Sequence, residues 1–212
     1  MIKHVIWDWN GTLIDDAQLC VSIVNQILSR NFLSKVSLDF YRNNFCFPVR
    51  EYYEKIGLSC EGIRYRELSE EFISEYRKRW KTCELQVNAL SVINSLKQAG
   101  VGQSILSASK STDLKLFVEK FGLKKYIDFA SGVCDVLASG KVEISKQHLN
   151  DIDAEPYEVL LVGDTKHDEE ISQHLSTHCI LFTEGHNSAN ALRGCSSELT
   201  DDLRQVRARV LG

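Results

Sequence analysis

The feature that most limits how this chain can fold is an apolar run near its start that stops on an acidic residue and turns at once. Residues 4 to 12 read His-Val-Ile-Trp-Asp-Trp-Asn-Gly-Thr. A short apolar run without polar alternation is typical of a strand buried on both faces, as in a parallel sheet. Asp8 then lies at the carboxyl end of that strand, the edge of an open α/β sheet where ligands bind. Gly11 allows the backbone to turn sharply there.

Three later segments bring further reactive side chains to the ends of predicted elements. A short predicted strand ends on the hydroxyl of Ser107, and an apolar strand ends on Asp164. Asp168 follows four residues after Asp164, and Lys141 opens an amphipathic segment. With Asp8, these groups comprise a nucleophile, a hydroxyl, a cation and two metal-binding acids. That set favours a phosphoryl-transfer site.

In this order and spacing, the four segments resemble the four motifs of the haloacid dehalogenase-like hydrolases, most closely those of phosphoglycolate-phosphatase-like members. The similarity spans nearly the whole chain and is weakest at residues 15–85, where only a helical pattern matches. The resemblance implies attack by Asp8 on a phosphomonoester, with an aspartyl-phosphate intermediate. One position departs from the pattern, because the family's phosphatases usually carry Asp two residues after the nucleophile and this chain has Asn10.

The resemblance also implies a bound Mg²⁺. Its ligands would be the Asp8 carboxylate, the backbone carbonyl of Asn10 and Asp164, with Asp168 nearby. Two carboxylates four residues apart across a strand-to-helix turn can both approach one hard cation. The alternative for Asp168 is an acid in the first turn of a helix, stabilised by the helix dipole. The amide side chain of Asn10 leaves metal binding intact but cannot transfer a proton.

The phosphoryl group itself would be held by a hydroxyl and by backbone donors. Ser107 at a strand tip and the N–H of Ala108 are the expected donors, and Thr12 is expected to bind substrate as well. A simpler interpretation of this segment is that Ser109 or Ser111 caps the following helix, and the two interpretations are compatible.

A lysine is expected to neutralise the phosphoryl oxygens. Lys141 precedes a Val-Glu pair at a helix start, where a cation opposes the helix dipole and so needs an anionic partner. Lys146 is the rival for this role, although its place inside the helix favours solvent exposure. His167 is a further candidate for proton transfer, and the alternative is a solvated loop histidine.

The apolar pattern predicts an α/β protein with a Rossmann-like parallel sheet of about five strands and helices on both faces. The strands are expected near residues 4–7, 104–107, 127–131, 159–163 and 179–182. The gap between the first two strands is too long for one crossover helix. We therefore expect a discontinuous core of residues 1–14 and 86–212 and an inserted helical cap domain of residues 15–85. Thr200 is expected to cap a last helix that begins with Asp201 and Asp202.

Within the insert, a segment of mixed aromatic residues is a candidate for contact with substrate. Pro48 prevents a continuous helix through it. Arg50 follows and would grip an anionic group of the substrate. The alternative is a turn in which Arg50 lies in solvent or pairs with Glu54.

Charge and composition exclude several function classes. The net charge of −4 and the pI near 5.9 indicate no excess of basic residues that would bind nucleic acid or an anionic membrane. No apolar run is long enough to span a bilayer. Seven cysteines without a CxxC pattern indicate buried thiols in a reducing compartment. We expect a cytoplasmic monomer or homodimer that acts on a small phosphorylated metabolite.

Three functions remain open on the sequence alone. The first is a Mg²⁺-dependent phosphatase for a phosphoglycolate-like or sugar phosphate ester, weakened by Asn10. The second is a phosphate-binding relative with little or no catalysis. The third is cleavage of a C–P or C–halogen bond. The acids Asp164 and Asp168 disfavour the halogen version because they imply a metal, and no recognisable cap lysine supports the phosphonate version.

Overall fold

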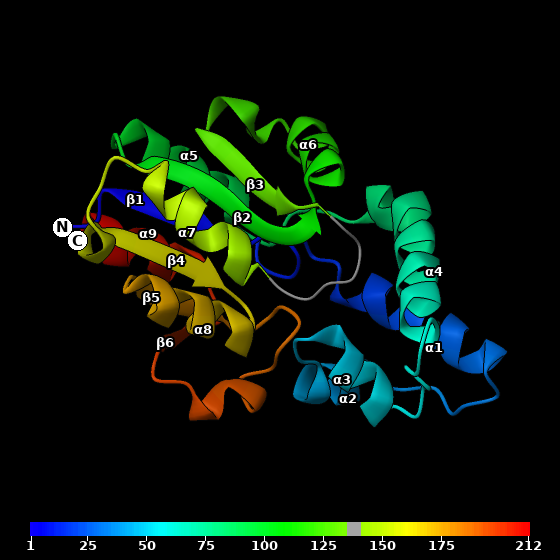
Figure 1. Ribbon diagram of the computed structural model, residues 1–212. Helices are drawn as coiled ribbons and strands as arrows, with labels where there is room; N and C mark the ends of the chain where they lie inside the picture. The colour runs from blue at the N-terminus through cyan, green and yellow to red at the C-terminus, as the bar shows by residue number, and fades with distance from the viewer. Residues whose placement is uncertain (135–140) are drawn as a thin grey trace.

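The computed structural model describes residues 1–134 and 141–212 and contains one parallel sheet. The strand order is β3-β2-β1-β4-β5-β6, and every neighbouring pair is parallel (Figure 1). The strands are β1 His4–Trp7, β2 Gly102–Lys110, β3 Phe129–Val133, β4 Val159–Gly163, β5 His178–Phe182 and β6 Glu198–Thr200. The predicted fold class, an α/β Rossmann-like sheet, is confirmed.

Helices cover both faces of the sheet (Figure 1). They are α5 Ala89–Gln98, α6 Ser111–Lys120, α7 Val142–Asn150, α8 Lys166–Leu175 and α9 Arg204–Leu211. Successive β1 residues point to opposite faces, so Val5 and Trp7 belong to the core on the side of α5 and α9, and Ile6 belongs to a second core on the side of α7 and α8. Both faces of β1 are therefore buried, as the unbroken apolar run predicts.

Of the α-helices that follow β1 and precede β2, the first four lie away from the core helices and beside the carboxyl edge of the sheet (Figure 1). They are α1 Ala17–Arg30, α2 Leu38–Asn44, α3 Val49–Lys55 and α4 Arg64–Arg79. Short 3₁₀ turns complete the described helices at Trp80–Thr82, Leu123–Lys125, Pro156–Glu158 and Ala191–Gly194. We call residues 17–82 the inserted helices.

The chain enters and leaves the inserted helices through two backbone segments that lie side by side. Ile14 and Leu85 form an antiparallel bridge, and the N–H of Gln86 donates to the carbonyl of Leu13 at 2.9 Å. The Asp15 N–H donates to the carbonyl of Glu84, also at 2.9 Å. These bonds hold the two ends of the insert side by side.

Two details of the predicted elements are wrong. A sixth strand, β6, contains Thr200, whose hydroxyl accepts from the Asp202 N–H at 3.1 Å, and α9 begins only at Arg204. The predicted helix start at Asp201 is therefore incorrect. The second strand does not stop at Ser107, because β2 continues to Lys110 with a register irregularity against β3. Among the described residues, no helix is long and apolar enough to cross a membrane.

Candidate active site

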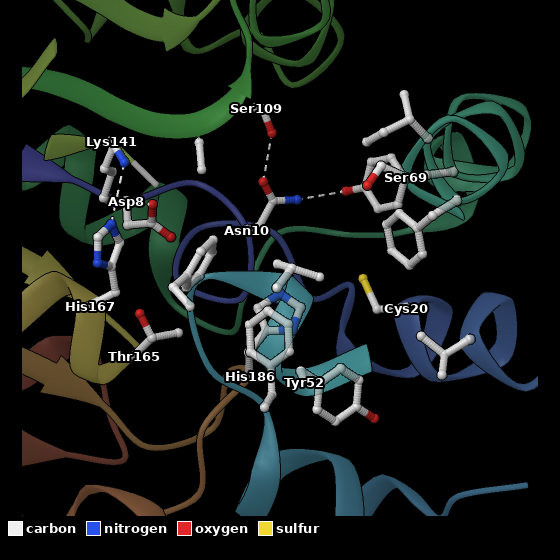
Figure 2. A pocket seen from close by; sticks show the side chains of 18 of the residues that line it. Asp8, Asn10, Cys20, Tyr52, Ser69, Ser109, Lys141, Thr165, His167 and His186 are labelled. Atoms are coloured by element: carbon white, nitrogen blue, oxygen red, sulfur yellow. Dashed lines mark hydrogen bonds and ion pairs between the residues drawn. The ribbon is translucent and has the colours of Figure 1, made fainter. Parts of the chain in front are cut away.

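Asp8 lies one residue beyond β1, in the middle of the sheet. Its N–H donates to the Val162 carbonyl of β4 at 2.8 Å, so the neighbouring strand holds its backbone. The Asp8 side chain receives a hydrogen bond from the ammonium of Lys141 (Figure 2). Lys141 also donates to the Leu106 carbonyl of β2 at 3.0 Å. Three segments far apart in sequence therefore meet at one buried carboxylate.

Lys141 is a buried cation between two carboxylates. It precedes α7, is 3% exposed, and lies 2.7 Å from Asp168 as well as against Asp8. Burial lowers the pKa of the Lys141 ammonium, but Asp168 and Asp8 outweigh it and the pKa is raised. Burial raises the pKa of Asp8 to about 8, Asp168 and Asp164 add to the rise, and the charge of Lys141 opposes it. Lys141 is therefore charged and favours the ionised form of Asp8.

Asp164 lies directly after β4 and is completely buried. One carboxylate oxygen accepts from the Thr12 hydroxyl at 2.9 Å, and the other accepts from the backbone N–H of His186. Burial raises the pKa of Asp164 to about 6, and Asp168 adds to the rise. The structure thus gives Thr12 a role in orienting Asp164.

Two glycines make room for the Asp164 carboxylate. A Cβ at Gly11 would lie 2.2 Å from an Asp164 oxygen, and a Cβ at Gly185 would lie equally close. Gly11 also has a φ of +78°, which side-chain-bearing residues rarely adopt. The turn after β1 therefore needs glycine for conformation and for space.

Asp168 is the third residue of α8 and accepts several hydrogen bonds. One oxygen accepts from the N–H and the hydroxyl of Thr165, at 2.9 and 2.7 Å, in a capping box. The other oxygen pairs with Lys141. Asp168 therefore acts both as the first-turn acid and as the partner that positions Lys141.

The three carboxylates fit a hard divalent cation. Ligand oxygens of Asp8, Asp164 and Asp168 all lie within 4.8 Å of one another, and all three residues are buried. One lysine compensates only part of this negative charge, and carboxylate oxygens are the donors that Mg²⁺ prefers. Because the Asp168 oxygens already accept from Lys141 and Thr165, Asp8 and Asp164 are the better placed ligands.

Asn10 lies beside Asp8, and its side chain is held on both sides. Its amide nitrogen donates to Asp16 at 2.7 Å and to the Tyr76 hydroxyl at 2.9 Å. Its carbonyl oxygen accepts from the Ser109 hydroxyl at 2.7 Å (Figure 2). This network fixes the amide and engages both of its ends.

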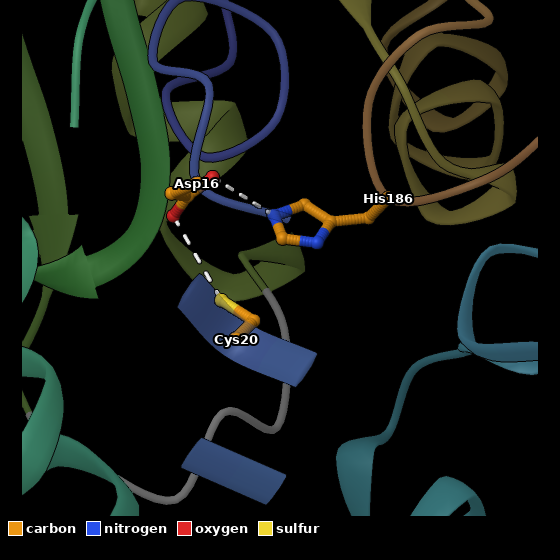
Figure 3. A group of neighbouring side chains, drawn as sticks. All are labelled: Asp16, Cys20 and His186. Carbon is orange, nitrogen blue, oxygen red and sulfur yellow. Dashed lines mark hydrogen bonds and ion pairs between the residues drawn. The ribbon is translucent and has the colours of Figure 1, made fainter. Parts of the chain in front are cut away.

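Asp16 and His186 form a buried ion pair next to Asn10 (Figure 3). Their closest atoms lie 3.2 Å apart, and the other ring nitrogen of His186 lies 2.9 Å from the Tyr41 hydroxyl. Burial opposes the charge on His186, but Asp16 raises the pKa of the imidazole to about 9. Cys20 lies close enough to complete a group of possible metal ligands with this pair.

Sequence reasoning missed this pair. Asp16 reads as an ordinary residue before a helix, and His186 lies 170 positions away in a polar loop, so no spacing connects them. The Asp16 oxygens accept from Gly11, Asn10 and Tyr76 as well as from His186. With this many donors, the Asp16 carboxylate is already satisfied by protein groups.

The remaining predicted residues occupy different places. Ser107 is 1% exposed, and its hydroxyl accepts from the Ser109 N–H at 3.0 Å, while Ala108 lines the pocket. Arg50 pairs with Glu54 at 2.9 Å and does not line the pocket. Lys146 is exposed on α7, so the structure brings Lys141 and not Lys146 to Asp8.

A pocket extends from Asp8 and Lys141 towards the inserted helices. His167 lines it and stacks on Phe47, with ring centroids 4.9 Å apart. One His167 nitrogen accepts from the backbone N–H of Lys141 at 3.3 Å, and the other lies 3.1 Å from Glu170. Both ring nitrogens therefore already have protein partners.

Comparisons with known proteins agree with this geometry. The family model for haloacid dehalogenase-like hydrolases matches residues 5–182. No curated protein matches the chain. Among solved structures, the chain is similar to a haloacid dehalogenase-like family hydrolase from Streptococcus pneumoniae (17% identity, TM-score 0.81, covering 98% of each chain). It is also similar to a predicted phosphatase from Clostridium acetobutylicum (18%, TM-score 0.79, 100% of this chain and 99% of the other).

A third similar structure is a predicted phosphoglycolate phosphatase from Haemophilus somnus (14% identity, TM-score 0.77, 100% of this chain and 98% of the other). At these identities the solved structures establish the shared fold, and the family model covers most of the chain. The protein belongs to the haloacid dehalogenase-like hydrolases.

Proposed function

We propose that this protein is a Mg²⁺-dependent phosphatase that hydrolyses a small phosphomonoester. The observation that carries the proposal is the buried Asp8 carboxylate at the sheet's carboxyl edge, paired with Lys141 and flanked by Asp164. A carboxylate in this setting can attack phosphorus, and a fixed ammonium beside it can neutralise the phosphoryl oxygens.

Hydrolysis would take place in two displacements at phosphorus. Asp8 forms a bond to phosphorus while the bond to the leaving oxygen breaks, and that oxygen departs with the electron pair. Water then attacks the aspartyl-phosphate, which releases inorganic phosphate and restores Asp8. Lys141 stays charged through both steps because it lies between Asp8 and Asp168.

Mg²⁺ would be held by Asp8, the Asn10 backbone carbonyl and Asp164. When bound, it would neutralise negative charge on the phosphoryl group and orient it for in-line attack. Thr12 and the Asp168 network fix the surrounding side chains, which keeps the carboxylates in place before substrate arrives.

Asn10 supports a second candidate, a ligand-binding relative with little turnover. The amide cannot protonate a leaving group, and general acid catalysis contributes about 10² to 10⁴-fold in rate. Cleavage of a phosphonate through a lysine imine is less well supported, because the inserted helices place no lysine in the pocket lining that the structure describes.

A panel of phosphorylated metabolites, assayed with and without Mg²⁺, tests the proposal. The Asp8→Asn variant removes the nucleophile while keeping the side chain's size, so we expect no turnover while the fold stays intact. If Asp8→Asn kept more than a few per cent of the activity, Asp8 would not be the nucleophile. If the wild type hydrolysed no ester of the panel, the ligand-binding function would replace the phosphatase.

A further inference from the structure

The inserted helices line their side of the pocket with aromatic rings. Rings come from α2, α3 and α4 and from the segment between α2 and α3. These rings include Tyr41, Phe45, Phe47, Tyr52, Phe72 and Tyr76. Figure 2 shows Tyr52 beside His186, below Asn10. The part of the substrate that extends from the phosphoryl group towards the insert therefore meets apolar faces.

This wall carries no charge in the part of the chain that the structure describes. None of the pocket residues contributed by the inserted helices is Lys, Arg, His, Asp or Glu. Arg50, the cation expected from the sequence, pairs with Glu54 outside the pocket. The cations that line the pocket, Lys110, Lys141 and His186, all come from the core. His186 pairs with Asp16, and Asp113 near Lys110 pairs with Arg77.

An uncharged wall disfavours a substrate with a second anionic group. Against the rings, the carboxylate of a phosphoglycolate-like ester would lose water without gaining a cation from the inserted helices, and burial of an unpaired charge is strongly unfavourable. An apolar group on the same phosphate would instead gain by leaving water. The wall therefore selects an uncharged, apolar leaving group.

The rings of the wall pack against one another, and the pocket beside them has the volume of one aromatic ring. Tyr41 and Phe45 stack at 5.0 Å between centroids, and Phe47 and Tyr52 each meet Phe45 edge-on at 5.5 Å. These distances fall in the range of favourable aromatic pairs. The pocket volume is about 150 Å³, and an engineered apolar cavity of about that size binds benzene. A single ring therefore matches the wall better than a nucleoside.

The chemistry at Asn10 leads independently to the same class of substrate. Its amide is held by Asp16, Tyr76 and Ser109 and has no acidic proton to give to a leaving oxygen. An alkoxide, whose conjugate acid is about as weak an acid as water, needs protonation as it departs. A phenoxide, with a pKa of about 10 like tyrosine, does not need it to the same extent.

We propose that the substrate is an aryl phosphomonoester with a single aromatic ring on the phosphate oxygen; this inference rests on the phosphatase function proposed above. Asp8 bonds to phosphorus, the bond from phosphorus to the aryl oxygen breaks, and the phenoxide leaves with the electron pair and takes its proton from bulk water. The second displacement by water, which releases its proton to solvent, is unchanged.

Three esters distinguish the effect of the aromatic ring from the effect of the leaving group. Phenyl phosphate has both the ring and the good leaving group, benzyl phosphate has the ring with an alkoxide leaving group, and phosphoglycolate has neither. With Mg²⁺ present, we expect kcat/KM for phenyl phosphate to exceed that for phosphoglycolate by tenfold or more. We expect benzyl phosphate to show a KM like that of phenyl phosphate and a kcat at least tenfold lower.

A pair of matched variants tests the wall itself. Phe72→Ala removes a ring that lines the pocket, and Phe40→Ala removes an exposed ring from α2, outside the pocket. We expect Phe72→Ala to raise the KM for phenyl and benzyl phosphate about tenfold without raising that for phosphoglycolate. Phe40→Ala should leave all three unchanged. A general loss of folding would affect the three esters alike.

The outcomes distinguish this inference from the function on which it rests. If phosphoglycolate is hydrolysed with a kcat/KM equal to or above that of phenyl phosphate, the phosphatase stands and the aryl substrate is refuted. An equal KM increase for all three esters in Phe72→Ala would also refute the aromatic wall. If Mg²⁺ supports hydrolysis of none of the three, both proposals fail.

Discussion

Asn10 places an amide where, in the proposed phosphatase, a carboxyl could protonate the leaving group. The side chain is fixed, because Asp16 and Tyr76 accept from its amide nitrogen and Ser109 donates to its amide oxygen. A carboxylate in this place would face Asp16 where the amide now donates at 2.7 Å. The chain is thus built around an amide, and Asp16 stays ionised through its pairing with His186.

Asn10→Asp should restore proton transfer. The introduced carboxyl lies against the Asp16 carboxylate, and this like charge raises its pKa, so that it holds a proton to donate. We expect turnover of benzyl phosphate to rise tenfold or more and that of phenyl phosphate to rise much less. The same repulsion should lower the melting temperature. Steady-state kinetics with both esters and thermal unfolding measure these effects.

Asn10→Ala is the control for this variant, because it removes the amide without adding a donor. It should not raise turnover of either ester. If Asn10→Asp left both esters unchanged in a wild type that already hydrolyses benzyl phosphate rapidly, another group would carry the proton. His167→Gln would then be the next variant to measure.

The sequence predicted most reliably the strands in which every residue is buried. β1 and β4 are short, apolar and buried on both faces, so their ends and the acids Asp8 and Asp164 could be located without a structure. β6 could not, because Glu198 and Leu199 are not fully buried and three residues are too short for a pattern. The predicted second strand ended too early because most of the last residues of β2 are polar.

The site was harder to predict than the fold. The motif acids follow strands, but the network around Asn10 depends on Asp16, Tyr76 and His186, which the tertiary fold alone brings together. Arg50 had a plausible motif but a local partner, Glu54, one helical turn away. Local sequence therefore located Asp8 and the motif residues near it, and could not locate the network around Asn10.

Two histidines tie neighbouring elements together in the core. His4 of β1 lies 2.8 Å from the Ser104 hydroxyl of β2, which lies 2.8 Å from a ring nitrogen of His148 on α7. The other His148 nitrogen lies 2.8 Å from the Ser131 hydroxyl of β3. This chain of hydrogen bonds joins three strands and a helix through neutral side chains.

Acid should break this chain. Burial lowers the pKa of His4 from 6.5 to about 4 and that of His148 from 6.5 to about 3. The unfolded chain takes up these protons first, so the free energy of unfolding should fall as the pH drops below 6.5 and level off below about 3. His4 would contribute on the order of 3 kcal/mol and His148 on the order of 5 kcal/mol. Asp128 favours the charged form of His4, and Lys97 opposes it.

Urea unfolding at several pH values measures this effect. His148→Gln keeps hydrogen-bonding groups but does not titrate, so it should reduce the slope of unfolding free energy between pH 6.5 and 4 by about half. His174→Gln, an exposed residue of α8, is the control and should keep the full slope. An unchanged slope in His148→Gln would show that other groups cause the acid sensitivity.

For the whole molecule, the site lies at the junction of core and inserted helices, and it is also where buried negative charge accumulates. Asp8, Asp164 and Asp168 are buried within reach of one another, and Lys141 is the lysine among them. The fold therefore carries a concentration of like charge that a divalent cation would relieve. Binding there should stabilise the folded state as a whole, because the unfolded chain has no such site.

Mg²⁺ should raise the melting temperature of the wild type and restore activity after chelation. At a Mg²⁺ concentration about 100 times the dissociation constant, the gain is about 2.7 kcal/mol, or roughly 5 to 10 °C for a chain of this length. Asp164→Ala should reduce this shift more than Asp168→Ala, because the Asp168 oxygens already accept from Lys141 and Thr165. Asp201→Ala, at an exposed position, should keep the full shift. A Mg²⁺ shift of equal size in wild type and Asp164→Ala would place the cation elsewhere, and full activity in excess chelator would indicate hydrolysis without a metal.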